Sequence, residues 1–439
     1  MQRLSGTPLG KLVSIDLEGE SIAAVEGEPV ACSLLAAGET VFSRSVKYHR
    51  PRGPFCFTGA CSHCLMRVDG VPNVFTCRVP ARAGMRLERQ NAFPSAKLDV
   101  FAATDWLFPH GLDHHELFAG VPIAEKVMLE VARHLAGLGL LPDKAPPQRQ
   151  PMLSLRTKIA IVGAGAAGLA AAEVLAARKV PFLLLEREDY LGGRLAHGAP
   201  LPSDPAIPAP SAMPEGAVHL GTTAIGLYED AEGRFLAAVE NERLVRVDAD
   251  RFLLTTGGHP QLFPFENNDL PGVFSARAVC ALLRLHRIKP GKVSVLVGGG
   301  EALDAVASLL AVSGIRIAAV IDPQGRSSHP AALQATAVKA HGRQQVRGLT
   351  VRLGNGLLQR VACDLLVVCQ NPAPSFELAR HAGAQVEFRE GVFAVQADEL
   401  GRTTQRLVFA AGEITGPMNA QAAHEKGRRA ALALAEELS

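Results

Sequence analysis

Aromatic residues are scarce in this chain. One Trp, three Tyr and 18 Phe account for 5% of its 439 residues. Proteins that hold single-stranded nucleic acids usually stack the bases on aromatic side chains. A bias toward one sign of charge is missing as well, because 45 Lys and Arg against 43 Asp and Glu leave a formal net charge of +2. Both absences argue against a nucleic-acid partner.

Long apolar segments are also rare. The N-terminus has no apolar signal core. Residues 159–177 are apolar over a length that could span a bilayer, but glycines divide them into a β-rich run, a turn and a helix rich in Ala and Leu. This division is typical of a nucleotide-binding unit. We therefore expect a cytoplasmic protein without an integral membrane segment, and we leave peripheral attachment at a membrane open.

Half of the eight cysteines are concentrated in one short stretch. Cys56, Cys61 and Cys64 form a C-x4-C-x2-C pattern, and Cys77 follows. This is the spacing of plant-type ferredoxins, in which four thiolates hold a [2Fe–2S] cluster. Zinc sites usually contain two short cysteine pairs, and disulfides are rare in chains without a secretory signal. The stretch therefore predicts a [2Fe–2S] cluster.

The segments around these cysteines alternate as a small α+β domain requires. Two strands, a short helix, the cysteine loop and a hairpin with an Asp69-Gly70 turn follow one another. We predict a ferredoxin-like domain over residues 1–95. The predicted elements are strands 11–17 and 21–25, helix 29–37, and strands 65–68 and 74–78, the last of which carries Cys77.

Residues 96–150 are predicted to form a connector. They contain an aromatic cluster with two adjacent histidines, followed by an amphipathic helix over 122–138. Adjacent histidines point in different directions and no further metal ligands surround them, so a docking surface is favoured over a metal site. The residues of this predicted surface are Trp106, Phe108, His114 and His115.

A β-α-β pattern begins near residue 156. The glycines Gly163, Gly165 and Gly168 lie between the first strand and the helix, and Glu186 ends the second strand. This is the G-x-G-x-x-G fingerprint in its full context. The glycines permit the turn, the approach of a pyrophosphate and close helix packing, and Glu186 can accept hydrogen bonds from the adenosine ribose. The unit is therefore predicted to bind a dinucleotide.

Three further motifs resemble those of two-dinucleotide-binding flavoproteins, which bind FAD in a first Rossmann unit and a nicotinamide nucleotide in a second, inserted one. One resembles their extended phosphate-binding segment, one their "ATG" strand–turn, and one the "FAAGD" element whose acid contacts the flavin ribityl chain. In this chain the acid of the third motif is Glu, which is one methylene longer. The motif residues are Arg187, Gly193 and Arg194, then Thr256 and Gly257, and finally Gly412 and Glu413.

The resemblance implies an α/β fold of the glutathione-reductase type, preceded by the small ferredoxin-like domain. An FAD-binding domain is expected in two parts, residues 151–265 and 386–439. An inserted NAD-like nucleotide-binding domain is expected over residues 266–385.

The inserted unit has an imperfect fingerprint. Gly298 and Gly300 occupy two glycine positions, but Leu303 stands at the third and should push the helix away from the strand. Asp322 ends the next strand, where an acid favours a ribose without a 2′-phosphate. The pattern predicts the fold of a nucleotide-binding unit and leaves open whether NAD, another adenine nucleotide or no ligand is bound.

Three stretches resemble one particular family. They are similar to the α subunits of heteromeric flavin dehydrogenases and oxidases that act on amines and amino acids, among them sarcosine oxidase, proline and hydroxyproline dehydrogenase, opine oxidase and hydrogen cyanide synthase. The stretches are Lys47–Gly53, Phe265–Ser275 and Asp364–Val368, and the element that ends in Gly412 and Glu413 adds to the resemblance.

This resemblance implies a division of labour. A partner β subunit, similar to D-amino-acid oxidases, oxidises the substrate C–N bond at its own flavin. Electrons then pass to the FAD and the [2Fe–2S] cluster of the α chain, often through an FMN at the subunit interface. Further small subunits are left open, although the cluster domain is fused here. The folate-binding half of sarcosine oxidase α has no counterpart in the 439 residues, so we expect no folate-dependent step.

The sequence thus predicts the electron-transferring α subunit of a heteromeric amine or amino-acid dehydrogenase or oxidase. No catalytic residue can be assigned. No cysteine pair lies beside the FAD motifs, which argues against disulfide reductase chemistry. A self-sufficient NAD(P)H:acceptor flavin/iron–sulfur reductase remains the enzymatic alternative, and an assembly scaffold with an empty second nucleotide site is the non-enzymatic one.

Overall fold

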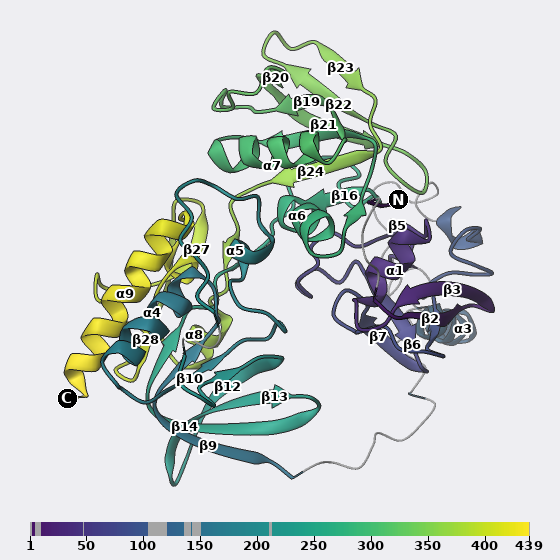
Figure 1. The fold of residues 1–439 in the computed structure, drawn as a ribbon. Coiled ribbons are helices and arrows are strands. Elements are labelled where there is room, and N and C mark those ends of the chain that lie inside the picture. The colour runs from purple at the N-terminus through teal and green to yellow at the C-terminus, as the bar shows by residue number, and fades with distance from the viewer. Residues whose placement is uncertain are drawn as a thin grey trace. The chain divides into compact units, whose positions relative to one another are not determined.

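The computed structural model describes residues 2–4, 10–46, 48–103, 121–135, 142, 151–209 and 213–438 (Figure 1). Its contacts divide the chain into two compact units. The first consists of Met1–Pro146 and Leu262–Gln370, and the second consists of Pro147–Gln261 and Asn371–Ser439. The inserted domain, residues 262–370, therefore forms one compact unit together with the N-terminal domain. The predicted surface residues Trp106, Phe108, His114 and His115 lie outside the described residues.

The N-terminal domain is built on a five-stranded sheet in the order β3-β2-β8-β6-β7. In β2, alternate residues are buried, which is the pattern of a strand with one face on a core. Helix α1 buries six of its seven residues. The described elements are β1 (Gln2–Arg3), β2 (Leu12–Leu17), β3 (Glu20–Val25), α1 (Val30–Ala36), β4 (Ser43–Arg44), β5 (Pro51–Arg52), β6 (Leu65–Val68), β7 (Val71–Phe75), β8 (Arg86–Glu88), η1 (Val100–Ala102) and α3 (Pro122–Leu135).

The return strand of the second hairpin differs from its prediction. We expected it over residues 74–78, but β7 covers Val71–Phe75, so Cys77 lies in the turn after the strand. The hairpin closes tightly because Asp69 and Gly70 both adopt positive φ, and Val68 pairs directly with Val71. The return strand therefore starts and ends earlier than we predicted.

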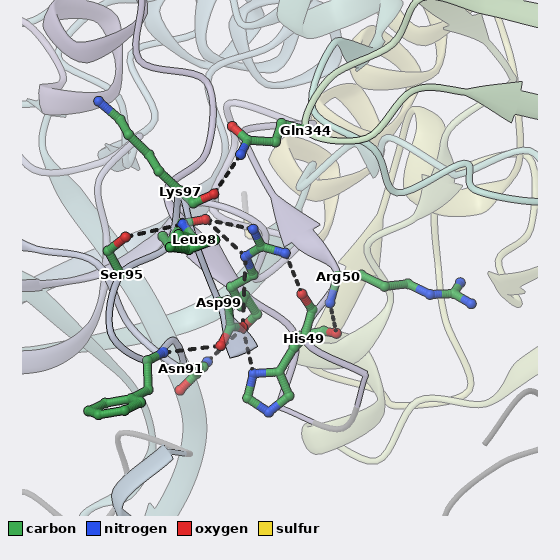
Figure 2. Close-up of polar contacts among 12 residues, drawn as sticks. His49, Arg50, Asn91, Ser95, Lys97, Leu98, Asp99 and Gln344 are labelled. Carbon is green, nitrogen blue, oxygen red and sulfur yellow. Dashed lines mark hydrogen bonds and ion pairs between the residues drawn. The ribbon is translucent and has the colours of Figure 1, made fainter. Parts of the chain in front are cut away.

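A buried polar network fastens the segment that precedes the cysteine loop (Figure 2). The carboxylate of Asp99 has no exposed surface, and its Oδ2 lies 2.9 Å from Nδ1 of His49. Its Oδ1 accepts a hydrogen bond from the amide of Phe93 at 3.1 Å. Nε of Arg44 lies 3.9 Å from Asp99, and the guanidinium donates to the carbonyls of His49 and Ala96. The network ties residues 91–99 to the cluster domain.

The inserted domain contains a parallel sheet in the order β16-β24-β18-β19-β20 and a separate antiparallel sheet, β21-β22-β23, which shares a hydrophobic core with it. The central strands β18 and β24 are buried along almost their whole length, as expected of a parallel sheet covered on both faces. Its elements are β16 (Val273–Ser275), α6 (Ala276–Arg284), β17 (Ile288–Lys289), β18 (Val293–Gly298), α7 (Glu301–Val312), β19 (Arg316–Ile321), β20 (Ala332–Leu333), β21 (Ala335–His341), β22 (Gly348–Leu353), β23 (Leu358–Val361) and β24 (Leu365–Cys369).

The second unit contains a seven-stranded sheet in the order β11-β10-β9-β14-β13-β12, with β28 paired to β14. Strands β10, β9, β14 and β28 run parallel, so their carboxyl ends meet at one edge. The elements are β9 (Leu153–Val162), α4 (Ala166–Ala177), β10 (Phe182–Leu185), α5 (Arg194–His197), β11 (Val218–His219), β12 (Thr222–Asp230), β13 (Gly233–Glu240), β14 (Arg243–Leu254), β15 (Gly258–His259), β25 (Ala373–Pro374), α8 (Glu377–His381), β26 (Val386–Arg389), β27 (Val392–Val395), β28 (Val408–Ala410), η3 (Glu413–Thr415) and α9 (Ala420–Glu437).

Helices α4 and α9 lie side by side in this unit (Figure 1). Their backbones approach so closely that a Cβ at Gly427 would lie 2.0 Å from the carbonyl oxygen of Ala167. Small residues at the contact permit this approach. The apolar stretch 159–177 is divided between β9 and α4, as its glycines predict. Among the described residues, no helix is both long and apolar enough to cross a membrane.

We predict that Asp99→Ala lowers the free energy of unfolding by about 3 kcal/mol, because it leaves the buried Arg44 guanidinium without its counter-charge and the amide of Phe93 without this acceptor. Urea denaturation followed by circular dichroism measures the change. Glu26→Ala is the matched control, since Glu26 pairs with Lys11 on the exposed surface of the same domain and should cost less than about 1 kcal/mol. Equal effects of the two variants would contradict the prediction.

Candidate cofactor sites

The cysteine loop is shaped by residues with positive φ and by hydrogen bonds to its ends. Phe57, Gly59 and Ser62 have φ of 54°, 71° and 39°. A Cβ at Gly59 would lie 3.2 Å from Cγ of Arg78, so the loop passes close to the segment that carries Cys77. The hydroxyl of Thr76 donates to the carbonyl of Cys64 at 2.7 Å. These contacts bring the four cysteines into one region.

The four thiols form a connected group. Cys56, Cys64 and Cys77 are buried, and Cys61 is partly exposed. Cys61 contacts Cys56, Cys56 contacts Cys77, and Cys77 contacts Cys64. Hydrogen bonds from Cys61 and Cys77 lower the pKa of the Cys56 thiol, and a hydrogen bond from Cys77 lowers that of Cys64.

The arrangement of the four thiols fits an iron–sulfur cluster. Sulfur atoms linked as a chain of pairs suit a binuclear centre, in which each iron takes two thiolates. The amide of Thr58 donates to Sγ of Cys56 at 3.3 Å, a type of hydrogen bond that tunes such clusters.

The first nucleotide unit has the close approaches that its fingerprint predicts. Gly163 has φ of 103°, and a Cβ there would lie 2.5 Å from the carbonyl oxygen of Thr255. A Cβ at Gly168 would lie 1.9 Å from the carbonyl oxygen of Gly163, so helix α4 could not begin at this place with a larger residue. By contrast, a Cβ at Gly165 would meet no atom within 4 Å. The space beside Gly165 is therefore open toward the N-terminus of α4, where a pyrophosphate binds in this fold.

Glu186 lies at the end of β10 and faces the same turn. Its Oε2 accepts a hydrogen bond from the amide of Ala164 at 2.7 Å, and its Oε1 accepts one from Glu188 at 3.0 Å. Burial raises the pKa of Glu186 above its usual value, and these two hydrogen bonds oppose the shift only in part. Arg187 follows Glu186 and pairs with Glu188.

The double-glycine segment turns back over the fingerprint. A Cβ at Gly193 would lie 3.4 Å from Cα of Gly165, and Gly193 precedes helix α5 with φ of 48°. The first residue of α5, Arg194, has a buried Nη2 atom without a hydrogen-bond partner, 3.7 Å from a carboxylate oxygen of Asp204. An orphaned guanidinium nitrogen in the segment that faces Gly165 suits a phosphate group.

The remaining predicted residues of this site come from two further elements. Thr256 donates its hydroxyl to the carbonyl of Ser375 at 2.8 Å. A Cβ at Gly257 would lie 3.7 Å from Oε2 of Glu413, and one at Gly412 would lie 2.9 Å from Cβ of Ala167. The fold thus brings the "ATG" turn and the Gly412-Glu413 element together at the carboxyl edge of the sheet. Thr255, which bonds the carbonyls of Val162 and Gly163, is the residue that our site prediction omitted.

The inserted unit is arranged differently around its acid. The carboxylate of Asp322 is almost fully buried and accepts hydrogen bonds from the amides of its own following loop, Gln324, Arg326 and Ser327. A Cβ at Gly299 would lie 2.5 Å from Oδ1 of Asp322, so the carboxylate rests directly on the glycine turn.

A second acid binds the same loop. Asp304, in the first turn of α7, accepts hydrogen bonds from the hydroxyl of Ser327 at 2.6 Å and from Ser328. Partial burial raises the pKa of Asp304, but these hydrogen bonds outweigh it and lower the pKa. Leu303 is fully buried at the third fingerprint position. Gly298 and Gly300 keep positive φ, so the turn itself is retained.

Two family models match the chain in these regions. Residues 10–92 match the model of a 2Fe-2S iron-sulfur cluster binding domain, and residues 157–322 match the model named pyridine nucleotide-disulphide oxidoreductase. With the fold described above, they define the class: an oxidoreductase with a two-dinucleotide-binding flavoprotein fold behind a ferredoxin-like [2Fe–2S] domain. The predicted fold class is confirmed.

Known relatives narrow this class. The sarcosine oxidase subunit alpha of Rhizobium meliloti (strain 1021) is 28% identical over 414 residues, which are 85% of this chain and 41% of the relative. The hydrogen cyanide synthase subunit HcnA of Pseudomonas aeruginosa is 35% identical over 79 residues, which are 18% of this chain and 75% of that subunit. The chain belongs to the family of sarcosine oxidase α subunits and their relatives, and it spans about two fifths of the sarcosine oxidase relative.

A solved structure agrees with the fold over the whole length. The L-proline dehydrogenase from P. horikoshii superposes with a TM-score of 0.72 at 22% identity, covering 100% of this chain and 75% of that one.

We predict that Cys61→Ser removes most of the iron, because one thiolate of the connected group is lost. Iron analysis and the visible absorption of an oxidised binuclear cluster after anaerobic purification measure this, with about two irons expected per chain of the unchanged protein. Cys363→Ala, which lies outside the loop, should keep the iron. Zinc in place of iron would contradict the assignment.

We predict that Gly165→Val yields folded protein without flavin. A Cβ at this position meets no protein atom within 4 Å, so the branched side chain can occupy the open space beside the turn. Gly168→Ala should instead destabilise the fold, because its Cβ meets the backbone of Gly163. Flavin absorption per chain and thermal unfolding separate the two effects, and full flavin content in Gly165→Val would refute the site.

Proposed function

We propose that this protein is the electron-transferring α subunit of a heteromeric flavin-dependent dehydrogenase or oxidase for amines or amino acids. Its substrates would be CH–NH donors of the sarcosine, proline, hydroxyproline or opine type. The observation that carries the proposal is the pairing, in one chain of this family, of a four-cysteine loop with a nucleotide unit whose glycine turn is open.

The residues of the chain divide the binding work between the two cofactors. In the first unit, Gly165 and Arg194 would receive the pyrophosphate of FAD, Glu186 would face the adenosine ribose, and Glu413 would lie toward the flavin end. Cys56, Cys61, Cys64 and Cys77 would hold the cluster. FAD exchanges electrons in pairs and a [2Fe–2S] cluster one at a time, so together they can connect a two-electron oxidation with a one-electron acceptor.

A partner is needed for the substrate chemistry. A β subunit similar to D-amino-acid oxidases would oxidise the C–N bond, and an FMN at the interface would fit the family pattern. Helix α3 supports a docking role, because Ile123 and Val127 are 81% and 59% exposed. HcnA of Pseudomonas aeruginosa, a separate subunit, is similar to this chain over 79 residues, which are 75% of HcnA. One small subunit would therefore be fused into this chain.

The self-sufficient NAD(P)H reductase is the second candidate, and the retained turn of Gly298 and Gly300 is the observation in its favour. Against it, Asp322 and Asp304 already bind their own loop, and Asp304 adds negative charge where a pyrophosphate would approach. A nucleotide that enters would have to displace these hydrogen bonds. This arrangement favours the α-subunit function, with a second unit that holds NAD or another adenine nucleotide weakly or not at all.

We predict that NADH leaves the flavin of the isolated chain oxidised, and that the isolated chain does not oxidise amino acids. Co-expression with a β subunit similar to D-amino-acid oxidases should give a stable complex that reduces an artificial dye with one amino acid of a screened panel. Stopped-flow absorption at the flavin band and a dye assay measure both outcomes. Bleaching of the flavin by NADH, or turnover of sarcosine, proline or an opine by the single chain, would refute the proposal.

A further inference from the structure

Two of the stretches that carry the family resemblance touch each other in the fold. The first, Lys47–Gly53, precedes the cysteine loop, and the second, Phe265–Ser275, belongs to the inserted domain. A Cβ at Gly53 would lie 3.1 Å from Cβ of Pro271, so the two backbones pass closely. The amide of Ser275 donates to the carbonyl of Phe55 at 3.0 Å. The start of the cysteine loop therefore rests on the inserted domain.

The apolar contacts at this place include a proposed cluster ligand. Phe55 and Cys56 are buried in one hydrophobic core with Leu270 and Val273 of the inserted domain. Cys61 packs against the same core. The cluster loop is thus not the exposed tip of an isolated ferredoxin domain, because two of its cysteines contact the neighbouring domain.

One charged contact crosses the same boundary. Nη1 of Arg52 lies 2.9 Å from Oδ2 of Asp269 in the inserted domain. The same nitrogen lies 3.3 Å from Nε2 of His63, between Cys61 and Cys64 in the loop. The side chains of Arg52 and Asp269 are 24% and 13% exposed, so water screens them only partly.

The rings of the loop complete the arrangement. The ring of His63 lies against that of Phe55, with centroids 6.1 Å apart and planes tilted by 55°. An arginine can only donate hydrogen bonds, so the contact with Arg52 has Nε2 of His63 as acceptor. Arg52 therefore connects the middle of the cysteine loop to a carboxylate of another domain.

We propose that Arg52 and Asp269 are positioning residues that fasten the cluster loop to the inserted domain and set the redox balance of the cluster. Reduction adds one negative charge to the cluster, so a nearby cation favours the reduced state and a nearby anion opposes it. The potential of such a cluster depends on the charges, hydrogen bonds and solvent exposure around it. The inference rests on the cluster of the proposed function and needs neither the partner subunit nor the substrate.

The two charges predict shifts of opposite sign. Arg52→Gln removes the cation and leaves the Asp269 carboxylate uncompensated, so the cluster should become harder to reduce. Asp269→Asn leaves the guanidinium uncompensated, so the cluster should become easier to reduce. At a fixed potential, the ratio of reduced to oxidised cluster should change about tenfold in each case, which equals ~59 mV for a one-electron couple. The double variant should lie near the unchanged protein.

The experiment uses the full chain, purified anaerobically and titrated with dithionite through redox mediators. Electron paramagnetic resonance of the reduced cluster gives both the potential and the signal shape, and iron analysis gives the cluster content. Arg82→Gln is the matched control, because Arg82 forms an exposed ion pair with Asp69 in the same domain. It should change neither the potential nor the iron content. Arg52→Lys, which keeps the charge, should return the potential most of the way toward that of the unchanged protein.

Shifts of the same sign in Arg52→Gln and Asp269→Asn, or no shift in either, would overturn the proposal. If Arg52→Gln loses its iron, the fastening role is supported and Asp269→Asn alone decides the redox role by the direction of its shift. Absence of iron in the unchanged chain would instead refute the cluster itself. Predicted shifts in the chain, together with no amino-acid-dependent dye reduction by its complex with the flavoprotein subunit, would refute the proposed function and leave this inference standing.

Discussion

The first nucleotide unit depends on one close backbone approach. Helix α4 begins so near the end of β9 that residue 168 has no room for a Cβ, and α9 packs against α4 across Gly427 with the same lack of space. These two approaches bring the N-terminus of α4, the Thr256-Gly257 turn and the Gly412-Glu413 element to one edge of the sheet. A cofactor site at this edge is a consequence of that packing, because backbone amides and the helix dipole converge there.

The inserted domain differs from the first unit at its third glycine position and around its acid. Leu303 is buried where the first unit has Gly168. Asp322 binds three amides of residues 324–327, whereas Glu186 binds one amide of its following loop. Asp304 in addition binds Ser327 and Ser328. The domain provides instead a platform for the cysteine loop, through Phe55, Cys56 and the Arg52–Asp269 pair. Of two units with a similar architecture, one can thus hold a cofactor itself, while the other supports the loop that holds a different cofactor.

Local patterns were sufficient for most of the fold. Alternating residues predicted β2 and β3, and the fingerprint predicted β9, α4 and β10, because strand pleat and helix start are short-range properties. The first strand of the hairpin was predicted correctly over residues 65–68, but the return strand before Cys77 was placed three residues late. Its boundary depends on a tight turn at Asp69 and Gly70, and on Thr76 bonding to the carbonyl of Cys64. This strand boundary is set by contacts with the cysteine loop and not by the β-propensity of the residues.

The sequence by itself determined the chemistry that this chain can support: four cysteines at ferredoxin spacing, one complete fingerprint, one imperfect one, and the motifs of a family. Only the tertiary structure decided how the parts serve each other. That Arg52 reaches both His63 and Asp269 could not be read from the chain, because Asp269 lies more than two hundred positions from the other two residues and no periodicity links them. The same is true of Asp322, whose identity suggests a ribose ligand while its hydrogen bonds go to its own loop. Residue types limit what a site can bind, and packing decides which of their hydrogen bonds remain free.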